Sequence, residues 1–197
     1  MGPKAKEAKR QRILDSAVVE IARRGYYGTT VANIASRAGV ADGTIYLYFK
    51  SKEDILVSIF EHAMRRFIDE AATIVDDPQL TPEEKLNRFI ALHLTLLGED
   101  RDLAVIFQVE FRHTLHVLEV LSHSHIRQYL ALIARVVDQG KRNGNFRPDV
   151  DPLFTAKMVF GILDEMATDW VLSKKNTRMA ARAEPVSAFV LGALQGS

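Results

Sequence analysis

The 197-residue sequence is informative first for what it lacks. It contains no cysteine, which excludes a disulfide scaffold and any thiolate zinc or iron–sulfur site and agrees with a reducing compartment. No stretch approaches the roughly 20 apolar residues of a membrane-spanning helix, and residues 1–12 lack the apolar core of a signal peptide. These absences predict a soluble, cytoplasmic protein that has no membrane partner.

The period-two alternation of a half-buried strand is equally hard to find. Apolar residues recur instead at helical spacing along nearly the whole chain. A content of 47% hydrophobic and 26% charged residues is typical of a globular protein and argues against intrinsic disorder. The sequence therefore predicts an all-α fold, with one generous core or two small modules.

Helix boundaries follow from apolar stripes, caps and breakers. The stripe of Ile13, Ala17 and Ile21 predicts a first helix that ends near Gly25. Two prolines and two acidic residues within 76–82 mark the clearest interruption of the helical pattern. The expected helices between these points cover residues 30–39, 42–49 and 51–75, and those beyond cover 82–96, 103–121, 125–143, 152–172 and 180–194.

The net charge of +1 conceals an asymmetry. Residues 1–52 contain ten lysines and arginines against four acidic residues, a net charge of +6, whereas the remainder carries −5. A basic segment at one end of an acidic chain suggests that this end contacts a polyanion. A solvated charged surface explains the same pattern equally well.

Residues 29–52 have the pattern of a helix-turn-helix, in which two short helices are joined by a glycine-containing turn. Ala35 is small where the helices must cross, and Val40 and Ile45 supply apolar contacts between them. The second helix of such a motif enters the major groove of DNA. Its predicted exposed residues are Gly43, Thr44, Tyr46, Tyr48, Lys50 and Lys52.

The string from Thr29 to Lys52 resembles the DNA-binding signature of the TetR family of transcriptional repressors, and the likeness runs from Ile13 to about Leu56. The resemblance implies a DNA-binding domain over 1–52 and a ligand-binding and dimerisation domain over 53–197. It also implies a set of DNA contacts. Phosphates would be held by Thr30, Tyr48 and Lys52, with Lys50 beside them, and bases would be faced by Ala41, Gly43, Thr44 and Tyr46.

Each of these side chains also has a purely structural interpretation. Thr30 is a good N-cap for the helix that follows it. Tyr46 and the neighbouring Phe49 are aromatic residues of the kind that fill small cores.

The resemblance further implies a homodimer, because one helix-turn-helix covers few base pairs and a palindromic operator needs two. The last two expected helices would form a four-helix bundle across a two-fold axis. Apolar residues on them are candidates for this interface, although the same residues would suit a core within one chain. They are Phe154, Met158, Ile162, Met166, Val186, Phe189 and Val190.

Segments 107–112, 140–147 and 160–173 resemble the subgroup that represses fatty-acid degradation and is released by long-chain acyl-coenzyme A. An acyl chain needs apolar walls, and the coenzyme phosphates need cations. The implied ligand residues are Phe89, His93, Leu97, Phe107, Phe111, Arg112, Tyr129, Ile162 and Trp170, and further candidate cations are Arg101, Lys141, Arg142 and Arg147. A filled core, or a different hydrophobic effector such as a drug or aromatic compound, is the alternative.

Two other classes of protein fit the sequence less well. An enzyme or metal site would draw on the histidines at 113, 116, 123 and 125 or on the acids at 164, 165 and 169, but no catalytic or metal-binding motif accompanies them. An architectural DNA-binding protein would need a more uniformly basic chain. We therefore expect no catalytic residue, no metal and no cofactor apart from the effector.

Overall fold

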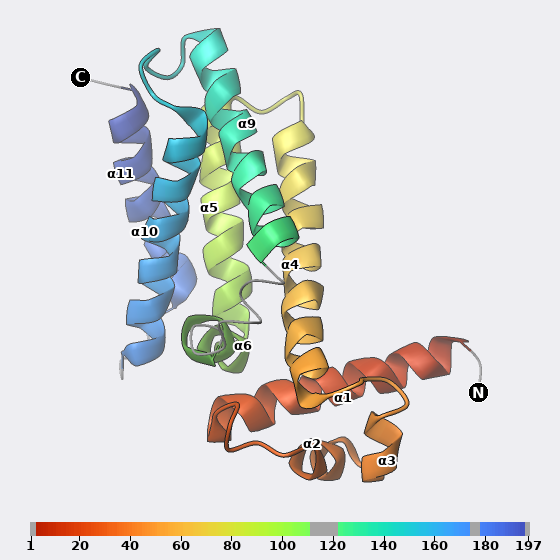
Figure 1. Ribbon diagram of the computed structural model, residues 1–197. Helices are drawn as coiled ribbons and strands as arrows, with labels where there is room; N and C mark the ends of the chain where they lie inside the picture. The colour runs from red at the N-terminus through yellow and green to blue at the C-terminus, as the bar shows by residue number, and fades with distance from the viewer. Residues whose placement is uncertain (1–2, 111–121, 174–177, 196–197) are drawn as a thin grey trace. The chain divides into compact units, whose positions relative to one another are not determined.

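The computed structural model describes residues 3–110, 122–173 and 178–195, and these residues form helices joined by turns, without a strand. The all-α prediction is therefore confirmed. Figure 1 shows the elements in chain order. Their bounds are α1 (Pro3–Arg24), α2 (Val31–Ala38), α3 (Asp42–Ile45), α4 (Lys52–Asp76), α5 (Pro82–Glu99), α6 (Arg101–Val105), η1 (Ile106–Glu110), η2 (Ser122–Ile126), α9 (Arg127–Asn143), α10 (Pro152–Leu172), η3 (Met179–Arg182) and α11 (Ala183–Gln195).

The described residues divide into two compact units. Unit 1 contains residues 3–63 and 102–110, and unit 2 contains 64–101, 122–173 and 178–195. The long helix α4 begins in unit 1 and continues in unit 2, so the division falls eleven residues after the domain boundary expected at 52. Among the described residues, no helix is long and apolar enough to cross a bilayer.

Unit 1 is built on the apolar face of α1. Ile13, Ala17 and Ile21 are completely buried, as their helical spacing predicts. Helix α1 begins at Pro3, ten residues before this stripe, because the basic segment continues the same helix without contributing to the core. The third helix is shorter than expected, since α3 ends at Ile45 and residues 46–48 form a turn.

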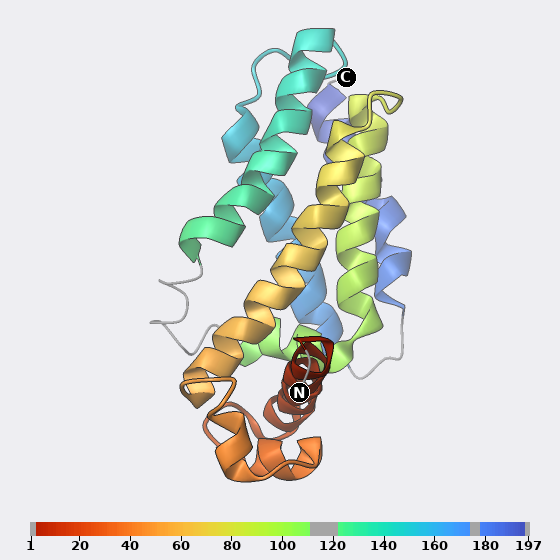
Figure 2. The same cartoon turned by 90° about the vertical axis from the view of Figure 1, so that its right-hand side faces the viewer.

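Unit 2 packs α5 against α9, α10 and α11 (Figures 1 and 2). Thr81 caps α5 through a reciprocal hydrogen-bond pair with Glu84, and Pro82 occupies the first turn, where a missing backbone N–H costs nothing. Helix α9 ends at Gly144, whose φ of 79° is a left-handed conformation that glycine adopts without strain. Phe89, Ile133 and Leu163 are among the completely buried core residues.

The structure differs from three expectations about these helices. Val186 and Val190 are buried within unit 2 of their own chain, so they are core residues rather than surface residues free for a dimer interface. The helix expected over 103–121 starts as α6 and continues as the wider helical turn η1, and its remainder lies outside the described residues. The last helix starts at Ala183, preceded by the tight turn η3.

Gly140 is a sensitive position of unit 2, because a Cβ atom built there would overlap the ring of Phe146. We expect Gly140→Ala to destabilise the protein by about 1–3 kcal/mol, the usual cost of overpacking a core. Urea denaturation followed by circular dichroism measures the change. Gly192→Ala is the matched control, since a Cβ there meets no atom within 4 Å. Equal stability of the Gly140→Ala protein and wild type would contradict the close packing of the Phe146 ring against Gly140.

Candidate DNA interface and effector site

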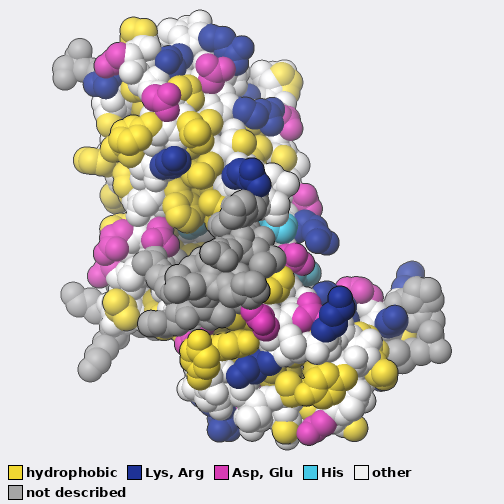
Figure 3. Space-filling model, viewed as in Figure 1, with side chains coloured by type: hydrophobic (Ala, Val, Ile, Leu, Met, Phe, Trp, Pro, Cys, Tyr) yellow, Lys and Arg dark blue, Asp and Glu magenta, His cyan; other side chains and the backbone are white. Residues whose placement is uncertain are grey.

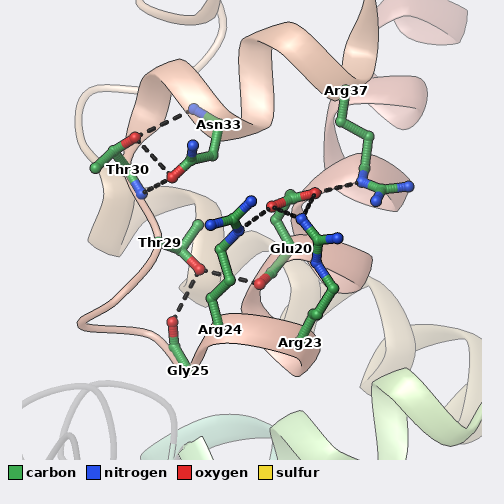
Figure 4. A network of polar contacts seen from close by, with 8 residues as sticks. All are labelled: Glu20, Arg23, Arg24, Gly25, Thr29, Thr30, Asn33 and Arg37. Atoms are coloured by element: carbon green, nitrogen blue, oxygen red, sulfur yellow. Dashed lines mark hydrogen bonds and ion pairs between the residues drawn. The ribbon is translucent and has the colours of Figure 1, made fainter.

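The first short helix of the helix-turn-helix is fixed at both ends by local hydrogen bonds. The hydroxyl of Thr30 accepts a hydrogen bond from the Asn33 backbone N–H at 3.2 Å, and the Asn33 side chain accepts one from the Thr30 backbone N–H at 3.0 Å (Figure 4). At the other end Gly39 adopts a φ of 63°, and the Val40 N–H returns to the Ala35 carbonyl at 3.0 Å. This reciprocal cap and left-handed stop set the direction in which the chain enters α3.

Helix α3 and the turn after it separate core residues from exposed ones. Ile45 and Phe49 are buried, and the guanidinium of Arg10 lies 5.1 Å from the centre of the Phe49 ring. Tyr46 is 59% exposed, which resolves the alternatives for these two aromatic residues in favour of packing for Phe49 and a surface position for Tyr46. The other predicted contacts on the exposed surface are Thr30, Ala41, Gly43 and Lys50, while Thr44 and Tyr48 are half-buried.

A buried carboxylate joins the first two helices. Glu20 on α1 accepts hydrogen bonds from Arg37 on α2 at 2.7 Å and from Arg24 at 2.8 Å, and Arg23 lies 3.3 Å away (Figure 4). The bond from Arg37, with the bond from Arg24 and the charge of Arg23, outweighs burial and lowers the pKa of Glu20 to about 2. Sequence reasoning missed this cluster because Arg37 lies 17 residues from Glu20.

Lys52, a predicted phosphate contact, forms hydrogen bonds within unit 1. Its ammonium group donates to the carbonyl oxygens of Tyr26 at 2.7 Å and Thr29 at 2.8 Å, and it lies 4.3 Å from the centre of the Tyr26 ring. Burial lowers the pKa of Lys52. Two of its three N–H donors therefore hold the loop between α1 and α2, so Lys52 has a structural role in unit 1. A phosphate contact through the third donor stays a prediction.

The same loop is held by η1. The carboxylate of Glu110 accepts a hydrogen bond from the Tyr26 backbone N–H at 2.7 Å, next to Gly25, whose φ is 75°. Phe107 of η1 stacks on Phe60 of α4 with ring centres 5.2 Å apart. Loop residues 25–29 are thus bound by side chains of α4 and η1, a link that no local sequence pattern indicates.

Three of the predicted effector residues come together in unit 2. Tyr129 lies with its ring centre 5.1 Å from that of Phe89 and 5.8 Å from that of His93. The Tyr129 hydroxyl and His93 Nδ1 are 3.1 Å apart and hydrogen-bonded. Phe67 and Phe160 complete the group by packing on Tyr129 at 5.1 and 5.4 Å. We call these five residues the aromatic cluster.

Burial governs the ionisation of the polar pair in this cluster. It lowers the pKa of His93 to about 4, against a smaller opposing effect of the Asp164 charge, and it raises the pKa of Tyr129 well above its usual value. Both side chains are therefore uncharged at neutral pH. Phe67 and Phe160 were not predicted, because a phenylalanine on an apolar helical stripe carries no signal that separates a ligand site from a core.

The other predicted effector residues do not join the cluster as a group. Trp170 lies under the guanidinium of Arg101, 4.8 Å from its ring centre, and ten residues beyond Phe160 on α10, which is about 15 Å along the helix axis. Leu97 is half-buried on α5, Ile162 lines a surface groove on α10, and Phe107 belongs to unit 1. Phe111 and Arg112 lie outside the described residues.

The candidate phosphate-binding cations have partners within the chain. Arg101 donates to the carbonyl oxygens of Val171 and Ser173, which closes the end of α10. Lys141 donates to the Val150 carbonyl at 2.6 Å. Arg142 pairs with Asp138 and Arg147 with Asp149. In the described part of the chain, no cluster of three or more histidine and acidic residues could hold a metal ion.

An apolar surface lies on α10 and α11 (Figure 3). Phe154 and Met158 of α10 are 63% and 56% exposed, and Phe189 of α11 is 69% exposed. A shallow groove on α10 is lined by Met158, Gly161, Ile162, Glu165 and Met166. Large apolar side chains exposed on the surface of neighbouring helices are typical of a surface that a partner covers.

Two protein-family models match this chain. The family model for bacterial regulatory proteins of the tetR family matches residues 13–59, and the model for the C-terminal region of YsiA-like protein matches residues 60–193. The chain is 35% identical over 191 residues to the fatty acid metabolism regulator protein of Bacillus subtilis (strain 168), which covers 97% of this chain and 98% of that protein.

Two solved structures are also similar, one described as a fatty acid degradation regulator and the other as a transcriptional regulator. FadR from Bacillus halodurans has a TM-score of 0.89 and 36% identity, covering 100% of this chain and 99% of that one. FadR from Bacillus subtilis, solved in complex with stearoyl-CoA, has a TM-score of 0.87 and 34% identity, covering 93% of this chain and 98% of that one.

The helix-turn-helix of unit 1 lies in the region matched by the model for bacterial regulatory proteins, which makes this chain a DNA-binding transcription regulator. The two matched regions together span most of the sequence, so the chain belongs to the TetR family of bacterial regulatory proteins. The family inferred from residues 29–52 is therefore confirmed, as is the likeness to fatty-acid regulators.

The Glu20 cluster predicts a specific acid sensitivity. Glu20→Gln keeps the shape of the side chain but removes its charge. We therefore expect the free energy of unfolding to fall by about 1–3 kcal/mol at neutral pH. The unfolded carboxyl titrates near 4.5 and the folded one near 2, so the unfolded state binds more protons between these values and the stability from Glu20 disappears as the pH falls through them. The difference between wild type and Glu20→Gln should narrow over the same range.

Urea denaturation from pH 7 to 2 measures this difference. Glu70→Gln is the matched control, because the Glu70 pair with Arg66 is exposed and should be worth less than about 1 kcal/mol. A difference for Glu20→Gln that stays constant from pH 7 to 2 would contradict the assigned pKa.

Proposed function

We propose that this protein is a transcriptional repressor of fatty-acid degradation genes that binds a palindromic operator as a homodimer and is released by a long-chain acyl-coenzyme A. The observation that carries the proposal is the 35% identity, over nearly the full length of both chains, to a fatty acid metabolism regulator. A similar solved structure, FadR from Bacillus subtilis, is in complex with stearoyl-CoA. A repressor of chromosomal genes works in the bacterial cytoplasm, where its operator and effector are.

The proposed DNA contacts divide into two kinds. Thr30 and Tyr48 hold phosphates, with Lys50 adding charge, and these contacts fix position without reading sequence. Ala41, Gly43, Thr44 and Tyr46 face the bases in the major groove. The exposure of Tyr46, and the absence of any atom within 4 Å of a Cβ built at Gly43, support this assignment, because a groove-facing surface must be free of protein contacts.

The proposed dimer pairs α10 and α11 with their copies in a partner. Phe154, Met158 and Phe189 are the exposed apolar residues that such an interface would bury, and Ile162 and Met166 line the groove on α10 together with Met158. With a two-fold axis, the same surface of each protomer packs against its copy in the partner. The dimer then holds two helix-turn-helix motifs at the spacing of two operator half-sites.

The proposed effector site lies at the aromatic cluster, whose apolar rings suit contact with an acyl chain. The ligand acts by binding the DNA-free state more tightly than the DNA-bound state, with α4 as the moving element that spreads the two DNA-binding units. A 100-fold loss of operator affinity requires about 2.7 kcal/mol of such differential binding. Since Arg101, Lys141, Arg142 and Arg147 are engaged within the chain, a phosphate contact by any of them would use N–H donors beyond those in these hydrogen bonds and ion pairs.

A TetR-family repressor that responds to another hydrophobic molecule is the second candidate. The observation that favours it is the set of rings around Tyr129, which would also stack on a flat aromatic compound. The experiment on release by acyl-coenzyme A separates the two candidates.

Charge in the α10–α11 surface should disrupt the dimer. We expect Met158→Glu combined with Phe189→Glu to raise the dimer dissociation constant at least tenfold, because the interface would bury two unpaired carboxylates. Analytical ultracentrifugation measures the constant. Tyr27→Glu is the matched control, since Tyr27 is equally exposed but lies in unit 1. A double variant that dimerises like wild type would place the interface elsewhere.

The effector is tested on operator DNA selected from a random pool, at a fixed salt concentration. We expect saturating stearoyl-coenzyme A to weaken operator binding about 100-fold, and free coenzyme A to leave it unchanged, because the proposed recognition includes the acyl chain. Fluorescence anisotropy of labelled operator gives both affinities. If the protein binds its operator specifically and acyl-coenzyme A does not change the affinity, the repressor function stands and a different hydrophobic effector is favoured.

A further inference from the structure

His93 has an unsatisfied polar atom at the centre of the aromatic cluster. Its Nε2 is buried and has no hydrogen-bond partner among the described residues. Leaving such an atom unpaired costs about 1–3 kcal/mol, and folded proteins seldom do so without a reason. The atom is therefore a candidate contact for a group that the described part of the chain does not supply.

The partner of the other ring nitrogen determines what Nε2 can do. The Tyr129 hydroxyl lies 3.1 Å from His93 Nδ1 and makes its hydrogen bond there. If the hydroxyl donates, Nδ1 is the acceptor, Nε2 carries the hydrogen, and a single N–H is left unpaired. If Nδ1 donated instead, both the Tyr129 proton and the Nε2 lone pair would be left unpaired. The first arrangement is favoured because it leaves fewer buried groups unsatisfied.

The surroundings define the chemical class of ligand. Nε2–H is a neutral donor, since burial lowers the pKa of His93 to about 4. The rings of Phe67, Phe89 and Phe160 around the pair are apolar. A matching ligand is mostly hydrocarbon and offers one uncharged acceptor. A free fatty-acid carboxylate fits poorly, because a buried anion needs a cationic partner, whereas a thioester carbonyl is uncharged.

We propose that His93 Nε2–H donates a hydrogen bond to the thioester carbonyl oxygen of the acyl effector, and that Tyr129 positions His93 by holding it in this tautomer. The proposal rests on the proposed function, to which it adds a residue that distinguishes a thioester from other apolar molecules. Loss of a bond to a buried donor is costly on the protein side, so this single contact confers selectivity.

The test compares stearoyl-coenzyme A with its S-octadecyl thioether, which has the same coenzyme and chain length but no carbonyl. We expect wild type to bind the thioester at least tenfold more tightly in isothermal titration calorimetry. The His93→Leu/Tyr129→Phe double variant, which removes both polar groups, should bind the two ligands equally. His93→Gln should restore part of the preference, because its amide nitrogen places a donor near the position of Nε2.

Two measurements keep the result interpretable. The operator affinity of each variant without ligand reports that it is folded. On wild type, the ¹⁵N chemical shifts of His93 report the tautomer directly, and we expect Nε2 protonated, with its shift changing on addition of the thioester but not of the thioether. A protonated Nδ1 would overturn the proposal even if the double variant failed to fold.

The outcomes separate this proposal from the proposed function. If wild type binds stearoyl-coenzyme A but does not prefer it to the thioether, or if the double variant keeps the preference, the role of His93 is overturned and the acyl-coenzyme A repressor stands. If wild type does not bind stearoyl-coenzyme A, the proposed effector is wrong and the role of His93 falls with it.

Discussion

The geometry of the DNA-binding unit depends on one buried carboxylate. Glu20 lies between three guanidinium groups, of which Arg37 comes from α2 and the other two from its own helix. Burying a carboxylate is unfavourable unless it is fully paired, and here the pairing lowers its pKa rather than raising it. Figure 4 shows Arg37 of α2 reaching Glu20 of α1. Because this pair fixes α2 against α1, it also fixes the turn at Gly39 that follows α2 and leads into α3.

The loop between α1 and α2 extends this constraint to other parts of the chain. The Thr29 hydroxyl lies within hydrogen-bond distance of the Glu20 and Gly25 carbonyl oxygens, Lys52 of α4 binds two further carbonyls, and Glu110 of η1 binds the Tyr26 N–H. A displacement of the first turn of α4 would therefore be transmitted to the helix-turn-helix through short hydrogen bonds. This arrangement supports α4 as the element through which an effector would act, since rigid contacts transmit a movement that loose packing would absorb.

Local sequence signals predicted most of the helices and their ends. The features that they missed depend on contacts between residues far apart in the sequence. The Thr30 and Thr81 caps and the glycine stops depend on residues within a few positions, so the sequence contains all of their determinants. The partners of Lys52 are 23 and 26 residues away, and an exposed lysine and a lysine bound to carbonyls look the same in one sequence. Val186 and Phe189 are both apolar residues of α11, but only the packed structure shows that one is core and the other surface.

The contrast between Glu20 and His93 suggests how structure and recognition divide between buried polar groups. Glu20 has several charged partners, which leaves its carboxylate no need for a ligand and makes it a fixed point of unit 1. Among the described residues, His93 has one hydrogen-bond partner and one unpaired nitrogen, within the rings of the aromatic cluster and near the charge of Asp164. A buried polar group whose hydrogen bonds are all made within the protein rigidifies the fold. A buried polar group with an unmade hydrogen bond favours a ligand that supplies the missing partner. The same desolvation cost that makes the first group structural would thus make the second one selective for its ligand.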